Sequence, residues 1–242
     1  MKITLLPGDG IGVEIVDAAV EVLDAAAKKF GMTIEYDRQL IGGAAIDATG
    51  VPLPEATIAS AKTADAVLLG AVGGPKWDNV APEIRPEKGL LGIRKALGLY
   101  CNLRPIKVSR FVAHLSPLKN ERVEGTDLLI VRELTGGIYF GAKNEAAPNA
   151  DGVETASDVE IYTRPEVERI AKFAFEAAKK RRGKVTSVDK ANVLASSRMW
   201  RRIVGEMQAK AYSDIELNNF YVDNCAMQLV LNPGQFDVVL TN

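Results

Sequence analysis

The chain has 242 residues, 47% of them hydrophobic and 25% charged, which is the balance of a globular protein with a full core. Its 30 basic and 31 acidic residues give a net charge of −1, which excludes the basic excess of a typical nucleic-acid-binding protein. No apolar run approaches the ~20 residues of a membrane helix, no signal-peptide layout opens the sequence, and two cysteines are too few for a disulfide framework. We expect a protein of the reducing cytoplasm, without nucleic-acid or membrane partners.

The first hundred residues alternate between predicted strands and helices. In chain order, the pattern predicts a strand at 3–6, a helix with apolar residues at 15, 16, 19, 22 and 23, a strand at 33–37, a helix at 55–62 and a strand at 66–69. This order predicts an α/β fold with a parallel or mostly parallel sheet and helices on its faces. Ligands of such sheets bind at the carboxyl ends of the strands, so the loops at 7–12 and 70–78 are the candidate binding loops.

The pattern changes near Leu99. Beyond it, the sequence predicts strands at 101–106, 128–132, 185–188, 220–222 and 236–240, and helices from Thr163, at 197–210 and at 224–231. Thr163 and Glu166 have the spacing of a capping box. The polar, Ala/Asn/Gly-rich segment at 142–158 is predicted to be an exposed arm or loop. The only histidine, His114, lies among apolar residues, which indicates a packing role.

A glycine-rich turn follows the first predicted strand. Gly8-Asp9-Gly10-Ile11-Gly12 resembles a phosphate-binding loop, but Val13 stands where the dinucleotide fingerprint requires its last glycine. A Rossmann site is therefore not predicted. A tight strand-to-helix turn is the simpler interpretation, because glycine is the usual residue of such turns.

Three arginines are candidate ligands for carboxylates. Arg94 lies on a predicted helix after Leu90 and Leu91, Arg104 is expected to follow a strand, and Arg132 ends another. Guanidinium groups pair bidentately with carboxylates, and an arginine at a strand end faces the crevice in an α/β fold. A solvated surface charge is the alternative for each. Arg104 and Arg132 adjoin apolar runs, which favours a binding role for them.

Acid–base and metal chemistry has three further candidates. Tyr139 and Lys190 have ordinary pKa values near 10, so neighbouring groups would have to tune either of them for catalysis. Each could equally be a surface or interface residue. Asp223 ends a predicted strand, where its carboxylate could contact a metal or cap the following helix. One carboxylate does not hold Mg²⁺ without further oxygen ligands.

At these residues the sequence resembles the 3-isopropylmalate dehydrogenases, members of the isocitrate/isopropylmalate dehydrogenase family of β-decarboxylating dehydrogenases. The most specific motif is Arg-Glu-Leu-Thr-Gly-Gly-Ile-Tyr-Phe-Gly at 132–141. The matching blocks are Leu6–Gly12, Gly42–Asp47, Gly73–Trp77, Arg85–Leu91, Asn102–Pro105, Val131–Gly141, Val188–Leu194, Tyr221–Asp223 and Phe236–Val239. So many blocks in one order make chance resemblance implausible.

The resemblance implies oxidative decarboxylation of 3-isopropylmalate to 4-methyl-2-oxopentanoate with NAD reduction, a step of leucine biosynthesis. By this resemblance, Arg94, Arg104 and Arg132 hold the substrate carboxylates. Tyr139 protonates the enol that remains after decarboxylation, and Lys190 takes the hydroxyl proton. Arginines of this kind fix a dianionic substrate in line with the acceptor of the hydride.

The resemblance also assigns the ligands of the cofactors and of the alkyl group. Asp223 binds Mg²⁺ or Mn²⁺ and touches substrate. The cofactor-binding residues on the nicotinamide side of NAD are Gly74, Pro75, Lys76, Glu87 and Asn192. Leu90 and Leu91 form a wall for the isopropyl group, where isocitrate dehydrogenases tend to place a hydroxyl or amide residue. An apolar wall disfavours a third carboxylate, because that charge would be left unpaired.

The fold implied by the resemblance is a two-domain, non-Rossmann α/β fold. Residues 1–99 correspond to the amino-terminal half of the first, cofactor-side domain, and residues 100–242 to the second domain, which binds substrate and dimerises. The family continues past Asn242 with two more metal-binding aspartates and the adenosine-binding loop, so the 242-residue chain alone is expected to be inactive. Lys190 and Asp223 are expected to serve the partner's site in a homodimer. The alternatives are an inactive fragment or interaction module, or a homoisocitrate, tartrate or isocitrate dehydrogenase.

Overall fold

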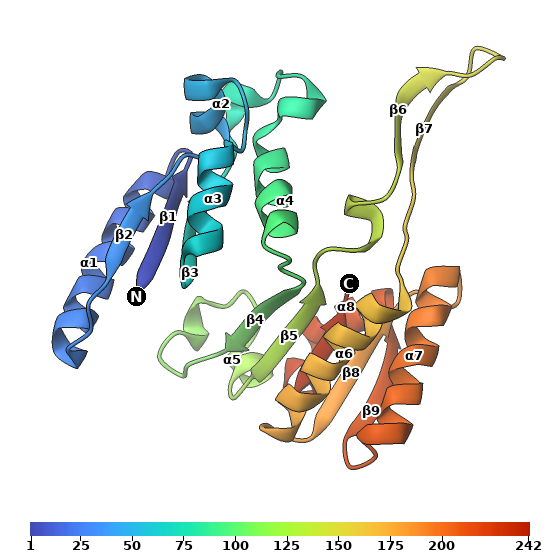
Figure 1. The fold of residues 1–242 in the computed structure, drawn as a ribbon. Coiled ribbons are helices and arrows are strands. Elements are labelled where there is room, and N and C mark those ends of the chain that lie inside the picture. The colour runs from blue at the N-terminus through green and yellow to red at the C-terminus, as the bar shows by residue number, and fades with distance from the viewer. The chain divides into compact units, whose positions relative to one another are not determined.

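A computed structural model describes residues 1–242 as two compact units, Met1–Leu99 and Tyr100–Asn242 (Figure 1). The elements of unit 1 are β1 (Lys2–Gly8), α1 (Gly12–Phe30), β2 (Glu35–Arg38), α2 (Gly43–Thr49), α3 (Glu55–Thr63), β3 (Ala66–Ala71), two short 3₁₀ turns (Pro75–Trp77 and Pro82–Ile84) and α4 (Pro86–Ala96). Those of unit 2 are β4 (Cys101–Lys107), α5 (Asn120–Val123), β5 (Asp127–Glu133), β6 (Lys143–Pro148), β7 (Glu154–Asp158), α6 (Arg164–Lys179), β8 (Lys184–Asp189), α7 (Ala195–Ala211), β9 (Glu216–Tyr221), α8 (Val222–Leu231), β10 (Val238–Thr241), and 3₁₀ turns at Ala113–Leu115, Gly137–Tyr139 and Pro233–Gln235.

Unit 1 is built on a parallel sheet with strand order β2-β1-β3. The central strand β1 is buried on both faces, as parallel strands covered by helices usually are. Ile3 and Leu5 pack with Val16 of α1 on one face. Leu6 packs with Ile93 of α4 on the other. The carboxyl ends of β1 and β3 therefore lie at one edge of the sheet, and the turns that follow them meet there.

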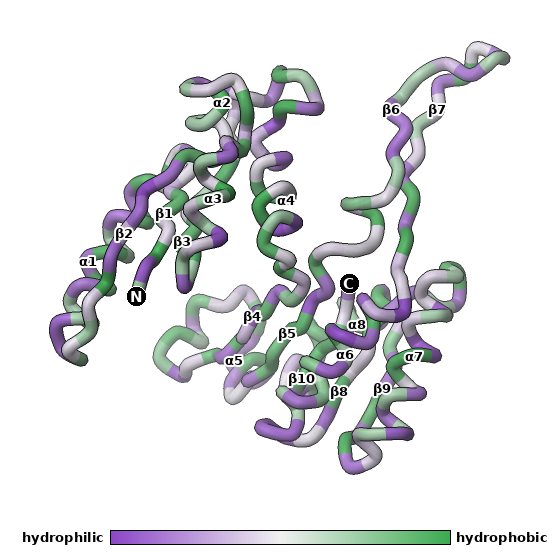
Figure 2. The backbone as a smooth tube through the Cα atoms, viewed as in Figure 1, coloured by the Kyte–Doolittle hydropathy of each residue, from purple (hydrophilic) through white to green (hydrophobic).

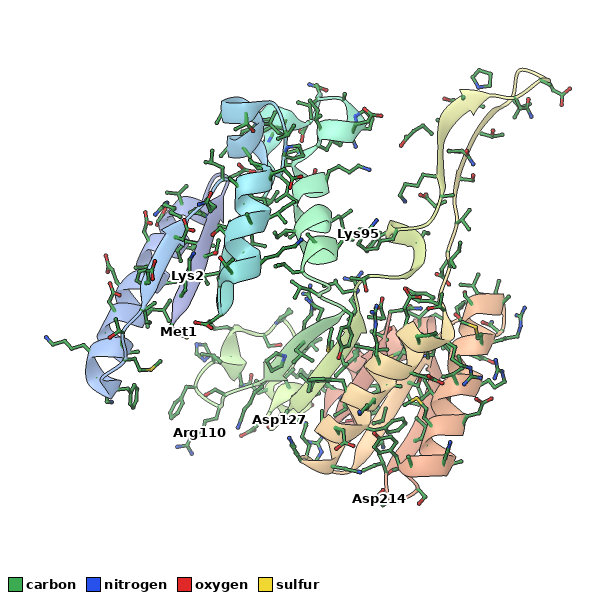
Figure 3. All side chains as sticks on the ribbon, viewed as in Figure 1. Met1, Lys2, Lys95, Arg110, Asp127 and Asp214 are labelled. Atoms are coloured by element: carbon green, nitrogen blue, oxygen red, sulfur yellow. The ribbon has the colours of Figure 1, made fainter.

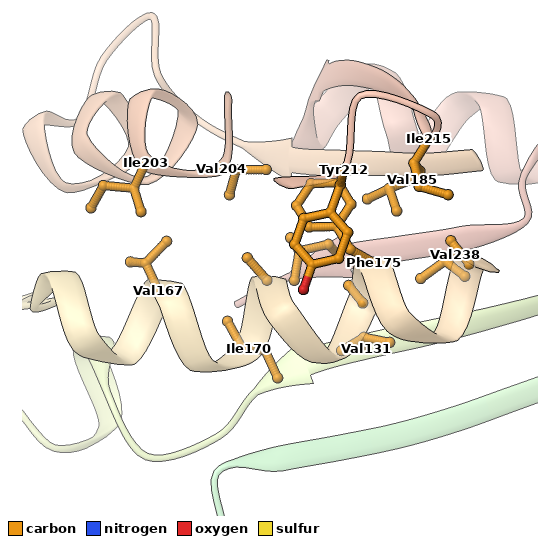
Figure 4. Packing of buried hydrophobic residues seen from close by; sticks show 14 of the residues in the cluster. Val131, Val167, Ile170, Phe175, Val185, Ile203, Val204, Tyr212, Ile215 and Val238 are labelled. Carbon is orange, nitrogen blue, oxygen red and sulfur yellow. The ribbon is translucent and has the colours of Figure 1, made fainter. Parts of the chain in front are cut away.

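Unit 2 contains a five-stranded sheet with order β4-β5-β10-β8-β9. Four strands are parallel and β4 runs antiparallel to β5 at one edge. Helices α6 and α7 cover one face with fully buried side chains such as Val167, Ile170 and Ile203 (Figure 4). Phe175 of α6 stacks on Tyr212 with ring centroids 4.6 Å apart. This face holds the largest core of the chain.

The other face of the unit 2 sheet carries a smaller core beneath α8. Leu128, Val188 and Val239 from three strands pack with Cys225 of α8. The remaining surface of α8 carries several exposed apolar side chains, with Met227 at 57% of its full exposure. Figure 2 shows hydrophobic and hydrophilic residues alternating along α7, as expected of a helix that is buried on one side only. The parallel strands begin at the edge marked by Asp127 and Asp214 in Figure 3.

The segment at 142–158 is an exposed antiparallel hairpin of β6 and β7, so the expectation of an exposed arm is confirmed and that of a loop is wrong. Its register shifts between Asn144 and Ala147, which indicates a bulge. The Lys143 ammonium lies 2.5 Å from an Asp158 carboxylate oxygen at the base, and the Asn149 side chain accepts two backbone amides at the turn. The hairpin is therefore stabilised by polar side-chain contacts and not by burial of apolar side chains.

Most predicted elements are present, but one helix was not predicted and two further local expectations are wrong. Helix α2 was not predicted. Asp223 lies inside the first turn of α8, whose amino-terminal cap is Tyr221, so Asp223 is not a cap. His114 is exposed in a short turn and does not pack. The capping box of Thr163 and Glu166 is confirmed at the start of α6. None of the helices combines the length and apolar character needed to cross a bilayer.

Candidate active site

Helix α4 presents two different faces. Pro86, Gly89 and Ile93 are buried against the unit 1 core, where a Cβ on Gly89 would lie 2.4 Å from the Pro52 carbonyl oxygen. An adjacent stripe of the helix carries the residues at i, i+3, i+4 and i+7, which are neighbours on a helix surface. They are Glu87, Leu90, Leu91 and Arg94. At 1.5 Å per residue, a carboxylate, two leucines and a guanidinium follow one another over about 10 Å.

A pocket of about 270 Å³ lies beside the amino end of α4. It is lined by Gly74, Trp77, Asp78, Arg85, Pro86 and Glu87. Gly73 precedes this lining with φ of 98°, a conformation that favours glycine, and a Cβ there would lie 2.9 Å from Glu87 Oε1. The loop after β3 and the start of α4 therefore form one small polar pocket at the carboxyl edge of the unit 1 sheet.

The 3₁₀ turn Pro75–Trp77 is held by Asp47 of α2. The Lys76 ammonium lies 2.6 Å from one carboxylate oxygen of Asp47, and the Trp77 indole donates to the other at 3.2 Å. Both hydrogen bonds lower the pKa of the Asp47 carboxyl, and the one from Lys76 has the larger effect. Gly74 and Glu87 line the pocket directly, whereas the Lys76 side chain turns to α2.

Two predicted substrate arginines share one face of the unit 2 sheet. Arg132 pairs with Asn102 across β5 and β4, and Arg104 pairs with Ile130 in the same antiparallel ladder. Directly opposite residues point to the same face, and so do residues two apart on one strand. Arg104 and Arg132 are therefore diagonal neighbours on the α8 face of the sheet. Arg104 lies within β4, not after a strand, and its Nε donates to Asn102 Oδ1 at 3.0 Å.

Tyr139 lies next to Arg132. The Arg132 guanidinium carbon is 5.5 Å from the centre of the Tyr139 ring, and Tyr139 is 55% exposed. Both residues line a pocket of about 140 Å³ with Glu160 and Tyr162. The pair places a cation and a phenol at the carboxyl end of β5, where an anionic ligand of unit 2 would meet both.

Glu133, which motif reasoning did not single out, fixes the backbone between Arg132 and Tyr139. Its side chain is fully buried and accepts hydrogen bonds from the Thr135 amide, the Thr135 hydroxyl and the Gly136 amide. Arg169 of α6 donates to the same carboxylate at 2.9 Å. The buried charge is thus paired and fully hydrogen-bonded, as a buried carboxylate must be. Only its position after an apolar strand could have signalled this role.

Lys190 and Asp223 meet at the other end of the same sheet edge. Their side chains are 2.5 Å apart, and the hydrogen bond from Lys190 is the largest cause that lowers the pKa of the Asp223 carboxyl. The neighbouring Asp189 is buried and receives two guanidinium hydrogen bonds from Arg201 of α7, at 2.9 and 2.7 Å. This clamp also fixes the Ala191 amide and hence the turn that carries Asn192.

The described residues provide one oxygen ligand for the expected metal. No three His, Cys, Asp or Glu side chains of the chain converge at a point that could hold an ion. The Asp223 carboxylate is exposed, and the hydrogen bond from Lys190 lowers its pKa below the usual value. It has the charge and accessibility of one ligand in a shared site, and its present partner is Lys190.

The thiol of Cys101 reports on the charge of Glu133. Burial first, and the Glu133 carboxylate second, raise the Cys101 pKa from 9.0 to about 11. Both disfavour the reactive thiolate, so we expect alkylation of Cys101 by iodoacetamide to be slow at pH 7–8 and to accelerate as the pH rises toward 11. The substitution Glu133→Gln removes the negative charge and should lower this pKa. Mass spectrometry of the alkylated peptide measures the rate.

Cys225 is the internal control for that experiment. Its pKa is raised by burial alone, so its alkylation profile should be the same in the wild type and in Glu133→Gln. An unchanged Cys101 profile in the variant would contradict the electrostatic contact between Glu133 and the thiol. A change at both cysteines would instead show that the variant loosens unit 2 as a whole.

The comparisons with known proteins agree with this arrangement. Residues 2–242 match the family described as isocitrate/isopropylmalate dehydrogenase. The chain belongs to the isocitrate/isopropylmalate dehydrogenase family. Among its relatives, the 3-isopropylmalate dehydrogenase of Bacillus licheniformis is 56% identical over 99% of this chain, and that of Carboxydothermus hydrogenoformans is 58% identical over 99%. The solved isocitrate dehydrogenase of Methylococcus capsulatus is 36% identical, with a TM-score of 0.79 over 99% of this chain and 66% of that chain.

The chain spans 65% and 64% of the length of those two curated relatives. Its isocitrate/isopropylmalate dehydrogenase fold confirms the predicted α/β class, with one parallel sheet and one mixed sheet. Of the predicted site residues, Glu87, Leu90, Leu91 and Arg94 share a helix face in unit 1. Those of unit 2 fall into two groups along one sheet edge, Arg104, Arg132 and Tyr139 at one end and Lys190, Asn192 and Asp223 at the other. Their individual roles stay predictions.

Proposed function

We propose that this protein is an NAD-dependent dehydrogenase that oxidatively decarboxylates an alkyl malate, with 3-isopropylmalate as its substrate and 4-methyl-2-oxopentanoate, the carbon skeleton of leucine, as its product. The carrying observation is the face of α4, on which Leu90 and Leu91 separate Glu87 from Arg94. The leucines are half-buried and belong to neither core cluster of unit 1, so they are available to an apolar group. The names of the relatives support the same substrate.

The arginines are proposed to bind and orient the dianionic substrate. Arg94 supplies one guanidinium from α4, and Arg104 and Arg132 supply two from neighbouring positions of one sheet face. Three guanidinium groups are enough to hold two carboxylates with bidentate geometry. The alkyl substituent is proposed to lie against Leu90 and Leu91. The wall would leave a third carboxylate unpaired, which favours alkyl malates over isocitrate.

Lys190 and Tyr139 are proposed to move the two protons of the reaction. The Lys190 nitrogen accepts the hydroxyl proton as hydride leaves the carbinol carbon, which gives a β-keto acid. That acid loses CO₂ and leaves an enol, to which the Tyr139 hydroxyl returns a proton at carbon. Arg132 lies against the Tyr139 ring, so a carboxylate held by Arg132 would lie close to the proposed acid. Each residue is a general acid or base of the kind that contributes about 10²–10⁴ in rate.

Two bound groups complete the proposal. NAD supplies the hydride acceptor, and its nicotinamide side is proposed to contact the pocket lined by Gly74 and Glu87 and the adjoining turn at Pro75 and Lys76. Asn192 of unit 2 is proposed as a further contact. The Glu87 carboxylate and an open glycine backbone suit a ribose, which offers hydroxyl donors. Mg²⁺ or Mn²⁺ supplies a Lewis acid for the developing enolate, and Asp223 is the ligand that this chain contributes.

We also propose a homodimer in which Lys190 and Asp223 complete the site of the partner. Four large apolar side chains of α8 are exposed in the single chain, namely Val222, Met227, Val230 and Leu231. Contiguous exposed apolar surface of this kind usually marks a protein–protein contact. The turn with Lys190 and the start of α8 with Asp223 adjoin this surface, so an interface there would carry both residues to its rim.

The substrate assignment is tested by NADH formation. The full-length protein with Mg²⁺ is offered 3-isopropylmalate, isocitrate, homoisocitrate and tartrate in parallel, and kcat/KM is compared. We expect 3-isopropylmalate to exceed the others. A higher kcat/KM for any of the other three would reject the alkyl malate assignment while leaving the reaction class in place. No turnover of any of them would reject the reaction class.

The variant Leu90→Ala tests the role of the apolar wall. Removing the side chain that meets the isopropyl group should lower kcat/KM for 3-isopropylmalate by roughly 10- to 200-fold, the range expected for lost contacts with one or two methyl groups. Activity on an unbranched malate should fall much less. Leu40→Ala, an exposed leucine of the same unit outside α4, is the matched control and should change neither value. Equal losses on both substrates would argue against a contact with the alkyl group.

A further inference from the structure

The glycine-rich turn after β1 holds a carboxylate of its own. Asp9 is 3% exposed, and its side chain accepts three backbone amides from segments far along the chain. One oxygen accepts the Gly43 amide at 2.8 Å and the Gly73 amide at 2.7 Å, and the other accepts the Ala44 amide at 2.7 Å. The turn that resembles a phosphate-binding loop thus contributes an internal anion to amides of two other loops.

The backbone around Asp9 is shaped for this contact. Gly42 has φ of 75°, and a Cβ there would lie 2.5 Å from Asp9 Oδ2. Gly8 has φ of 72°, and a Cβ there would lie 2.0 Å from the Ala71 carbonyl oxygen. The same carbonyl accepts the Asp9 amide at 2.7 Å. Any side chain at Gly42 or Gly8 would push the three loops apart, so both glycines are needed for close approach.

We infer that Asp9 is a positioning residue of the cofactor-side pocket. Its carboxylate holds the Gly73 amide, and Gly73 in turn leads directly into Gly74 and lies against the Glu87 carboxylate on its other side. The loop between β3 and the turn Pro75–Trp77 therefore takes its conformation from a residue outside the pocket. This inference rests on the proposed function, because it assumes that the loop is part of the NAD-binding site.

A carboxylate is the only common side chain that satisfies all three amides at once. Asparagine has the same size but one acceptor oxygen, and its amide nitrogen would face at least one backbone donor. Asp9→Asn should therefore release one or two loops, and a lost hydrogen bond to a charged group corresponds to roughly 10- to 100-fold in the equilibrium it supports. Gly42→Ala displaces the carboxylate without changing its charge and should act in the same direction.

The experiment compares these variants with Asp37→Asn. Asp37 is a second carboxylate of unit 1 that accepts hydrogen bonds from Ser60 and Gln39 and does not contact the Gly73 loop. Amide hydrogen exchange is measured at Gly43, Ala44 and Gly73 without ligand, and NAD and 3-isopropylmalate are titrated in steady-state assays of the full-length protein. Amide exchange in the wild type tests the contact by itself. This part of the experiment therefore stands even if Asp9→Asn does not fold.

We expect the three amides to be protected in the wild type and to exchange about tenfold faster or more in Asp9→Asn and Gly42→Ala. The KM for NAD should rise by roughly 10- to 100-fold in both, with a much smaller change in kcat and in the KM for 3-isopropylmalate. An unprotected Gly73 amide in the wild type, or an equal rise of the NAD KM in Asp37→Asn, would overturn the inference. A wild type that uses no NAD would overturn the proposed function instead, while exchange at Gly73 would still decide whether Asp9 holds the loop.

Discussion

Replacing Lys190 by methionine is expected to lower kcat by about 10²–10⁴, the contribution typical of a general base. Methionine keeps the unbranched shape but has no amine to accept the hydroxyl proton. The fold should be unchanged, because Lys190 is partly exposed and Asp223 largely exposed, and ion pairs open to solvent contribute little to stability. Circular dichroism and NADH formation by the full-length protein measure the two effects separately.

Lys184→Met is the matched control for that result. Lys184 begins the same strand, β8, whose end carries Lys190, and it forms a comparable exposed pair with Glu216 at 3.3 Å. It lies at the opposite edge of the sheet, so its loss should leave kcat unchanged. Equal activity of Lys190→Met and Lys184→Met would contradict a catalytic role for Lys190. A further variant, Lys190→Gly, leaves space for a small amine. Recovery of its activity on addition of methylamine, with no such recovery in Lys190→Met, would support a catalytic role for Lys190.

Replacing Asp237 by alanine is expected to destabilise unit 2 by about 3–5 kcal/mol, the usual cost of breaking a buried ion pair. Asp237 is fully buried before β10 and accepts Arg181 Nε at 2.8 Å and the Arg182 amide at 2.9 Å. Its removal leaves the Arg181 Nε–H and the Arg182 amide without their acceptor, although Arg181 Nη2 keeps Asp127. Urea unfolding followed by the fluorescence of Trp200, which is fully buried in the same unit, measures the loss.

Asp127 provides a control that shares the same arginine. Its carboxylate lies 2.7 Å from Arg181 Nη2 but is 40% exposed, and the hydrogen bond from Arg181 is the main cause that lowers its pKa. Water can replace that partner, so Asp127→Ala should shift the urea midpoint far less than Asp237→Ala. Similar shifts for both would show that burial does not decide the strength of this pair.

Elements with local signals were predictable from the sequence. The start of α6 has its capping box within four residues, and the strands β1, β3 and β5 are continuous apolar runs. Helix α2 was missed because its first amides are bound by Asp9, 34 and 35 residues earlier in the chain. The strands β6 and β7 were missed because alanine, asparagine and glutamate have little strand propensity and their ladder depends on the pairing itself.

The site was predictable to the level of residue types and less so in its geometry. Motifs pointed to Arg104 and Arg132, but only the register of β4 against β5 makes them neighbours on one face. Glu133 and Asp9 were missed as organising groups because a buried carboxylate is recognised by the amides it accepts, and these come from positions that no local pattern connects to it. A charged residue directly after an apolar strand is the weak signal that both share.

The two glycines on the inner side of α4 affect how substrate preference could change. Gly89 lies against the Pro52 carbonyl and Gly92 against the Leu53 side chain, so the helix backbone is seated on unit 1 with no room to slide or rotate. Any new preference must then arise by exchange of side chains on a fixed backbone. Under the role proposed for Leu90 and Leu91, a library that varies only these two codons samples other alkyl or polar substituents while sparing the core.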